Sequence, residues 1–141
     1  MDFFQTVAPT SAAASVNIVL AVTNELGYPV NHLDTAQAVM QAELDCTVYM
    51  KLPGGFSSLS GNIVRLEKAL YGRRQSGLLW NSLLVKTFVM RHGMEQCKTD
   101  PCMFRKFRDG KVVLILVVHV DDMTVAGTEN EVSELHPVLN D

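Results

Sequence analysis

The sequence has no apolar run long enough to cross a membrane. Its longest run, Val112–Val118, falls far short of the roughly 20 residues that a membrane-spanning helix needs. The first residues, Met1–Gln5, lack the basic segment that opens a secretory signal peptide. We therefore expect an intracellular protein that has no membrane partner.

Cysteine is scarce in this chain, which limits its redox chemistry and its metal sites. There are 3 cysteines, Cys46, Cys97 and Cys102, so any disulfide scheme leaves one of them unpaired. No further cysteine or histidine pair stands at zinc-finger spacing, and we expect all of them to be reduced thiols. A Ser-His-Asp or Cys-His catalytic arrangement and a Walker-type glycine loop are also absent.

Basic residues are missing from both ends of the chain. All 12 lysines and arginines lie between Lys51 and Lys111, although the formal net charge is −3. In the flanking segments 1–50 and 112–141, the charged side chains, histidine apart, are all acidic. A basic middle between acidic ends suits a protein that binds phosphates with one segment and cations with the others. A solvated basic surface fits this charge distribution equally well.

The apolar pattern predicts an α+β fold. Helical spacing covers Ser11–Leu26 and Leu78–His92, and good helix formers fill Ala36–Glu43. Strands are expected over Pro29–Leu33, Thr47–Leu52, Ile63–Leu66, Met103–Phe107, Lys111–Val120 and Thr124–Ala126, with a loop over Pro53–Asn62 and a hairpin turn at Asp109-Gly110. We expect an antiparallel sheet with helices packed on one face.

Two adjacent carboxylates, Asp121 and Asp122, follow the most apolar predicted strand, and a third, Asp34, follows another. Adjacent acids repel each other, so such a pair is either stabilised by a cation or exposed by a turn. We expect a turn at Asp121-Asp122, because only a bend brings successive strand residues to one site. Three aspartates at strand ends suit the two divalent cations, about 3.5–4 Å apart, that assist nucleotidyl transfer. They also fit a solvated hairpin turn that binds nothing.

The segment His119-Val120-Asp121-Asp122 resembles the Tyr-x-Asp-Asp motif of reverse transcriptases, with histidine in place of tyrosine. Further segments, in the same order as in that family, resemble reverse transcriptases of copia-type retrotransposons. They are Phe4–Pro9, Leu33-Asp34 leading to Glu43-Leu44, Val48–Pro53 with Gly55-Phe56, Arg65–Ser76 with Trp80, and Gly93–Lys98 with Asp100–Phe104. The resemblance covers nearly the whole chain.

This resemblance implies a right-hand polymerase fold, of which residues 1–141 form the palm and part of the fingers. The thumb and RNase H regions would belong to other parts of a larger polyprotein. The resemblance also implies that Asp34, Asp121 and Asp122 bind two Mg²⁺ ions, which Mn²⁺ can replace. With these ions they would catalyse RNA-directed DNA synthesis on a template-primer from deoxynucleoside triphosphates.

Other positions acquire expected roles from the same resemblance. Gln75 and Val39 fall at nucleotide-binding positions. Lys51, Arg73 and Arg74 would contact the phosphates of the template-primer in a salt-sensitive, sequence-independent way.

Several positions depart from the family pattern. Val39 is smaller than the aromatic residue that excludes a ribose 2′-hydroxyl, and the basic residues expected near Asn17 and at Ala36 are absent. These departures favour an alternative, a catalytically inactive, truncated or decayed remnant that folds and binds nucleic acid. Another two-metal phosphotransferase, such as a nucleotide cyclase or a nuclease, is a second alternative. We expect His119 to pack within the sheet and Trp80 to lie in the core.

Overall fold

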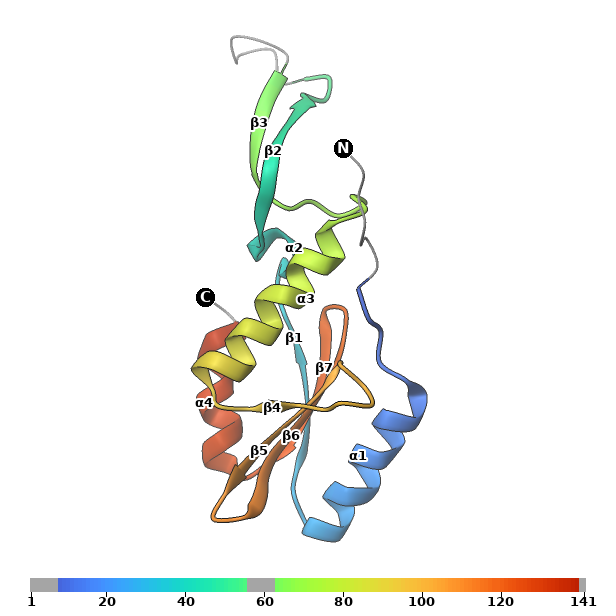
Figure 1. Cartoon of the computed structure of the whole chain (residues 1–141), viewed down its shortest axis with the longest axis vertical. Helices are drawn as coiled ribbons and strands as arrows, with labels where there is room; N and C mark the ends of the chain where they lie inside the picture. The colour runs from blue at the N-terminus through green and yellow to red at the C-terminus, as the bar shows by residue number, and fades with distance from the viewer. Residues whose placement is uncertain (1–7, 56–62, 140–141) are drawn as a thin grey trace.

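A five-stranded antiparallel sheet forms the centre of the molecule (Figure 1). Its strands, in spatial order, are β1 (Val30–Asp34), β7 (Asp122–Gly127), β6 (Lys111–His119), β5 (Met103–Arg108) and β4 (Glu95–Gln96). This computed structural model describes residues 8–55 and 63–139, with side chains as far as residue 135. Residues 4–7 of the segment Phe4–Pro9 and residues 56–62 of the predicted loop lie outside these described residues.

The helical segments agree with the sequence prediction in the first and middle parts of the chain. They are α1 (Ala13–Leu26), α2 (Ala38–Gln41), α3 (Ser76–Lys86), a π-helical turn (Thr87–Arg91) and α4 (Glu129–Leu139). The helix expected over residues 11–26 is confirmed as α1. The helix expected over 78–92 is confirmed as α3 together with its π-helical continuation. The sequence patterns did not predict α4 or β4.

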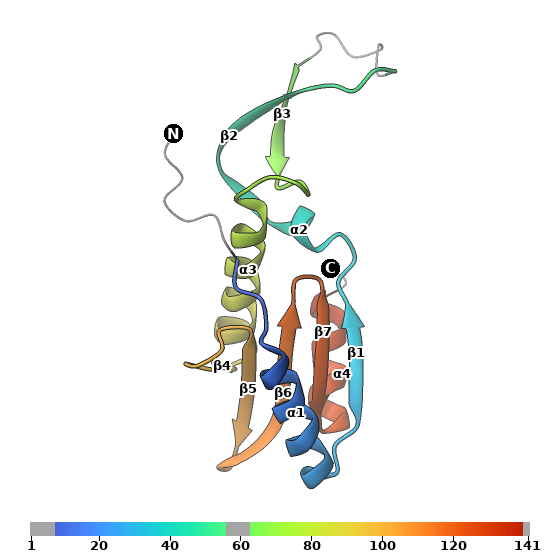
Figure 2. The ribbon, with the colours of Figure 1, turned by 90° about the vertical axis from the view of Figure 1, so that its right-hand side faces the viewer.

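A two-stranded ribbon, β2 (Glu43–Lys51) and β3 (Ile63–Lys68), extends beyond the end of the sheet that carries the β6–β7 turn (Figures 1 and 2). The helix expected over 36–43 is shorter than predicted, because it ends at Gln41 and β2 begins at Glu43. The backbone becomes extended at Ala42, and Glu43 pairs with Lys68 in the ribbon. Tertiary pairing outweighs the weak local preference for a helix at these positions.

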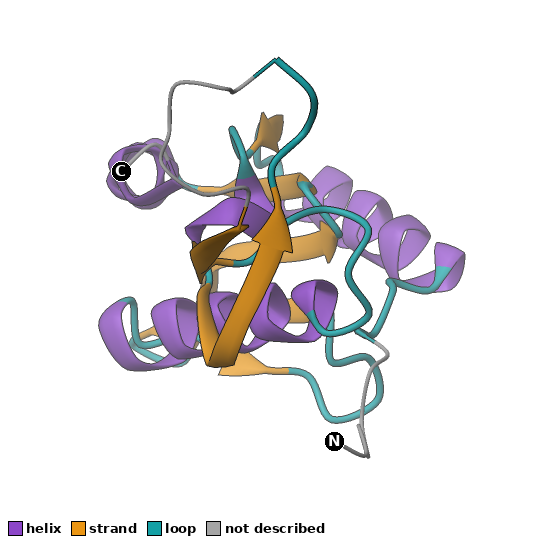
Figure 3. Ribbon diagram, turned by 90° about the horizontal axis from the view of Figure 1, so that it is seen from above, coloured by secondary structure: helices purple, strands orange, loops and turns teal. Residues whose placement is uncertain are grey.

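Helices cover both faces of the sheet, so the prediction that they pack on one face only is wrong (Figure 3). The residues of β6 alternate between the two faces, as strand geometry requires. Leu114 and Leu116 join the main core with side chains of α3 and α4. Ile115 and Val117 point the other way and pack with Val19 of α1. The almost unbroken apolar sequence of β6 is explained by this burial on both faces.

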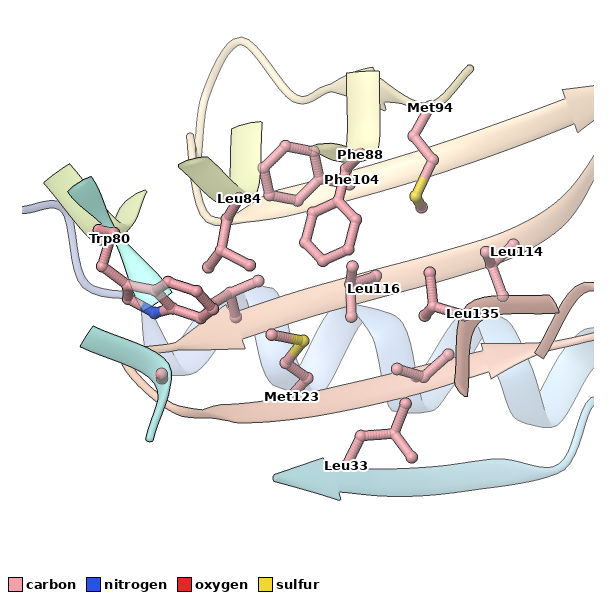
Figure 4. Packing of buried hydrophobic residues seen from close by; sticks show 14 of the residues in the cluster. Leu33, Trp80, Leu84, Phe88, Met94, Phe104, Leu114, Leu116, Met123 and Leu135 are labelled. Atoms are coloured by element: carbon pink, nitrogen blue, oxygen red, sulfur yellow. The ribbon is translucent and has the colours of Figure 1, made fainter. Parts of the chain in front are cut away.

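Three aromatic side chains, Trp80, Phe88 and Phe104, lie among the aliphatic side chains of the main core (Figure 4). The rings of Phe88 and Phe104 meet edge to face, with centroids 5.2 Å apart. Trp80 is only 3% exposed, which confirms its predicted place in the core. Full burial of a side chain of this size contributes roughly 1.5–3 kcal/mol, and this core fixes α3 against the sheet.

The hairpin between β5 and β6 also follows the prediction. Its turn residues, Asp109 and Gly110, have φ angles of 50° and 73°. A two-residue turn with positive φ at both positions matches the right-handed twist of the flanking strands, and Asp-Gly adopts it readily.

Candidate metal site at the end of the sheet

Asp34 and Asp122 are paired directly across β1 and β7. Opposed residues of an antiparallel pair project from the same face, so both carboxylates emerge on one face of the sheet. Asp121 lies in the adjoining β6–β7 turn, where its carbonyl oxygen accepts a hydrogen bond from the Thr35 amide at 3.2 Å. The structure thus brings the backbone of all the predicted metal-binding aspartates to one end of the sheet.

The β6–β7 turn differs from the prediction by one residue. His119 pairs with Asp122, so the loop is Val120-Asp121 and not Asp121-Asp122. Val120 has a φ angle of 59°, a left-handed conformation that strains a β-branched residue. The indole Nε1 of Trp80 donates a hydrogen bond to the Val120 carbonyl oxygen at 2.9 Å and so helps to hold this turn.

The two adjacent carboxylates each contact a different protein side chain. Oδ2 of Asp121 accepts a hydrogen bond from the Tyr71 hydroxyl at 3.1 Å. Oδ1 of Asp122 lies 3.3 Å from Nε2 of His32, a neighbour of Asp34 on β1. Oδ1 of Asp121 is buried and has no hydrogen-bond partner. Among the side chains of residues 8–55 and 63–135, no three from His, Cys, Asp or Glu are already arranged to hold a metal ion.

Tyr71 reaches this site from the turn between β3 and α3. Burial raises the pKa of its hydroxyl, and the hydrogen bond to Asp121 and the negative charges of Asp121 and Asp34 raise this pKa further. The hydroxyl therefore stays protonated at neutral pH and acts as a donor within electrostatic reach of both carboxylates. No sequence signal identified this contact, because Tyr71 lies 50 positions from Asp121 along the chain.

The same turn carries the polar residues expected to bind nucleotide and phosphate. Gln75 is half-buried at the start of α3, and its Oε1 atom has no hydrogen-bond partner. Nε of the half-buried Arg73 also lacks a partner, while Arg74 is exposed. Lys51 is exposed at the end of β2. Through Tyr71, this turn is connected to the acidic end of the sheet.

Val39 and His119 lie differently from the sequence expectation. Val39 is 3% exposed within the main core, so its side chain presents no surface to a nucleotide. His119 is exposed and not packed in the sheet, because it is the last residue of β6. Its Nδ1 atom lies 3.1 Å from Oγ of Ser11, just before α1.

The cysteines are free thiols, as the sequence predicted. Burial raises the pKa of Cys102 to about 11, which keeps this thiol neutral. In the part of the chain that the structure describes, no helix is both long enough and apolar enough to span a membrane.

The fold and the site define an α+β domain whose antiparallel sheet gathers aspartates at one end. Beside them lies the basic turn, residues 69–75 between β3 and α3, which carries Arg73 and Arg74. Residues 1–138 match the family model described as "Reverse transcriptase (RNA-dependent DNA polymerase)", and the chain belongs to this family. The resemblance to copia-type retrotransposon proteins is confirmed by its relatives.

These relatives are much longer transposon polyproteins. The "Retrovirus-related Pol polyprotein from transposon RE1" of Arabidopsis thaliana is 31% identical over 99% of this chain and 9% of its own length. The corresponding polyprotein from transposon TNT 1-94 of Nicotiana tabacum is 27% identical over 92% of this chain and 10% of its own length. The "Transposon Ty1-DR4 Gag-Pol polyprotein" of Saccharomyces cerevisiae is 26% identical over 80% of this chain and 6% of its own length. The chain spans a tenth or less of each relative, and no solved structure matches it.

Proposed function

We propose that this chain is the palm-and-fingers segment of an RNA-directed DNA polymerase from a retrotransposon polyprotein. The five-stranded sheet would be the palm, and the ribbon β2–β3 with the basic turn would be part of the fingers. The observation that carries the proposal is the pairing of Asp34 with Asp122 beside Asp121 at one end of the sheet. Membership of the reverse transcriptase family supports it.

Asp34, Asp121 and Asp122 would supply the oxygen ligands for Mg²⁺ or Mn²⁺. The buried Oδ1 atom of Asp121 supports this fit, because a partnerless buried carboxylate oxygen is unfavourable and a cation would satisfy it. When bound, a pair of divalent cations activates the attacking 3′-hydroxyl and stabilises charge on the leaving pyrophosphate. Since Oδ1 of Asp122 contacts His32 in this structure, a cation bound by this oxygen would have to replace the contact with His32.

The remaining predicted residues would contact the substrates. Gln75 would contact the incoming deoxynucleoside triphosphate through its partnerless amide oxygen. Lys51, Arg73 and Arg74 would bind template-primer phosphates, so the affinity for nucleic acid should fall as the salt concentration rises. The buried side chain of Val39 could shape a nucleotide site only through the backbone that carries it.

A catalytically inactive remnant is the second candidate. It is favoured by the absence of basic residues near Asn17 and at Ala36 and by the burial of Val39. Such a protein would keep the fold, and the basic turn could still bind nucleic acid without any synthesis.

A primer-extension assay on a primed template, with Mg²⁺ or Mn²⁺, tests the proposal. Asp121→Asn removes a charge but keeps the shape of the side chain. It should lower extension by more than about 100-fold, the upper range for loss of a residue that only supports a metal ligand. Asp109→Asn is the matched control, because it makes the same change in an exposed turn and asparagine tolerates positive φ.

The outcomes separate the candidates. Extension by the wild type and by Asp109→Asn, but not by Asp121→Asn, supports the polymerase. Nucleic-acid binding without extension in all three proteins supports the remnant. Product formed without a primer, or cleavage of the template, would instead indicate a different two-metal phosphotransferase.

A further inference from the structure

Tyr71 connects the basic turn, which would contact nucleotide and phosphate, with Asp121, which would bind a metal ion. It belongs to the basic turn, and its hydroxyl donates to Oδ2 of Asp121 at 3.1 Å. Tyr71 is 53% exposed and lies outside the main core, so core packing does not hold the partly buried ring in place. Its position is explained by the hydrogen bond to Asp121 and by the turn that carries it.

The turn around Tyr71 is well constrained. The Ser76 hydroxyl donates to the Leu70 carbonyl oxygen at 2.7 Å, and the Ser76 amide donates to the Arg73 carbonyl oxygen at 3.2 Å. Gly72 has a φ angle of 84°, which a residue with a side chain rarely adopts. Since Ser76 is buried at the start of α3, the helix and its core contacts fix the backbone on which Tyr71 stands.

The two carboxylate oxygens of Asp121 have different environments. Oδ2 is engaged by Tyr71, whereas Oδ1 is buried and has no partner. A hydrogen bond that holds one oxygen of a carboxylate limits the directions in which the other oxygen can point. Residues outside the ligand set commonly orient metal ligands in this way, and their loss typically lowers metal affinity about 10–100-fold.

We infer that Tyr71 is a positioning residue for the metal site, which holds Asp121 through Oδ2 and leaves Oδ1 to bind a divalent cation. This inference rests on the proposed function, because it assumes that Asp121 is a metal ligand. It adds a direct connection between the basic turn and that ligand, so a displacement of the turn would change the orientation of Asp121.

The test is Mn²⁺ titration of the full chain, by electron paramagnetic resonance or calorimetry, with Tyr71→Phe as the variant. Phenylalanine keeps the ring and removes only the donor. We expect the Kd for Mn²⁺ to rise about tenfold, while the unfolding temperature without metal stays unchanged. Tyr49→Phe is the matched control, because Tyr49 is 65% exposed on β2 and should lose its hydroxyl without effect.

The outcomes of the titration test the positioning role of Tyr71 separately from the metal site. Weaker Mn²⁺ binding in Tyr71→Phe alone, at equal thermal stability, supports the positioning role. Equal affinity in the wild type and Tyr71→Phe, with loss of binding in Asp121→Asn, overturns this role and leaves the metal site standing. Absence of saturable binding in the wild type, or full binding in Asp121→Asn, overturns the metal site and the positioning role together.

Discussion

Replacing Asp100 by alanine should destabilise the chain strongly, because this carboxylate caps a helix that has no cap of its own. The N-cap of α1 is Ala12, without a side-chain hydrogen bond, and the first turn contains no acidic residue. Asp100 supplies the missing acceptor from 88 positions away, since its Oδ2 accepts from the Ala12 amide at 3.2 Å. It also accepts from the Ser15 hydroxyl and, through Oδ1, from the Cys102 amide at 2.9 Å.

The expected loss follows from these contacts. Asp100 is 8% exposed, and its hydrogen bonds to Ser15 and Cys102 are buried. Loss of a cap costs about 1 kcal/mol, and each buried donor left without an acceptor costs about 1–3 kcal/mol. We expect Asp100→Ala to lower the free energy of unfolding by about 3 kcal/mol. Asp100→Asn keeps an acceptor oxygen and should cost about half as much.

Urea unfolding followed by circular dichroism measures both variants. Burial alone would raise the pKa of Asp100, but hydrogen bonds from Ser15, Cys102 and Ala12 outweigh it and hold the pKa below its ordinary value of 3.8. A lowered folded-state pKa contributes stability that is fully present above the unfolded-state pKa and is lost as the pH falls through the folded-state pKa.

The difference in stability between the wild type and Asp100→Asn should therefore be largest near neutral pH and shrink below about pH 3.8. A loss below about 1 kcal/mol for Asp100→Ala, or a difference that grows on acidification, would refute the capping role.

Two further substitutions test the packing that holds β7 and α4 in place. A Cβ added at Gly127 would lie 2.5 Å from the Val113 carbonyl oxygen, so Gly127→Ala should cost about 2–3 kcal/mol in thermal unfolding, since the backbone must shift. Glu131 is 5% exposed and pairs with Lys106 and Arg108, so Glu131→Gln should cost about 2 kcal/mol in the same assay, because among the described side chains only the exposed Glu134, 3.9 Å from each of these cations, is then left to pair with them. A change within about 0.5 kcal/mol, as at an ordinary surface site, would contradict either expectation.

The parts of the fold that were predictable are those in which local preference and tertiary packing agree. Asp109-Gly110 suits its turn by backbone preference alone, and the β-branched, apolar run within Lys111–Val120 is buried over residues 114–118 as the strand β6. The segment Ala36–Glu43 shows the opposite case. Its residues favour a helix by small increments, and pairing of Glu43 with Lys68 outweighs that preference.

The placement of helices could not be predicted from periodicity. An amphipathic pattern shows that a helix buries one side, but not which face of the sheet it covers. The residues that place α1 are Ile115 and Val117, which point away from the main core. The almost unbroken apolar sequence of β6 is typical of a strand buried on both faces, and this pattern alone argues for helices on both sides.

The carboxylates of the site were predictable as residues, whereas the contacts that orient them were not. Asp34 ends β1 and Asp122 begins β7, and strand ends are visible in the sequence as breaks in an apolar run. The contacts with Tyr71 and His32 depend on side-chain positions across the fold. No spacing along the chain encodes such contacts.

The one-residue shift of the β6–β7 turn determines how the adjacent aspartates are held. Because Val120 and not Asp122 occupies the turn, Asp122 becomes the first residue of β7 and is fixed to one face by its pairing with His119 and Asp34. A further shift by one residue would move its side chain to the opposite face. Asp121, in the turn, has no such register and depends on Tyr71 and on the backbone contact with Thr35. The register of the sheet therefore positions one carboxylate of the pair, and the basic turn positions the other.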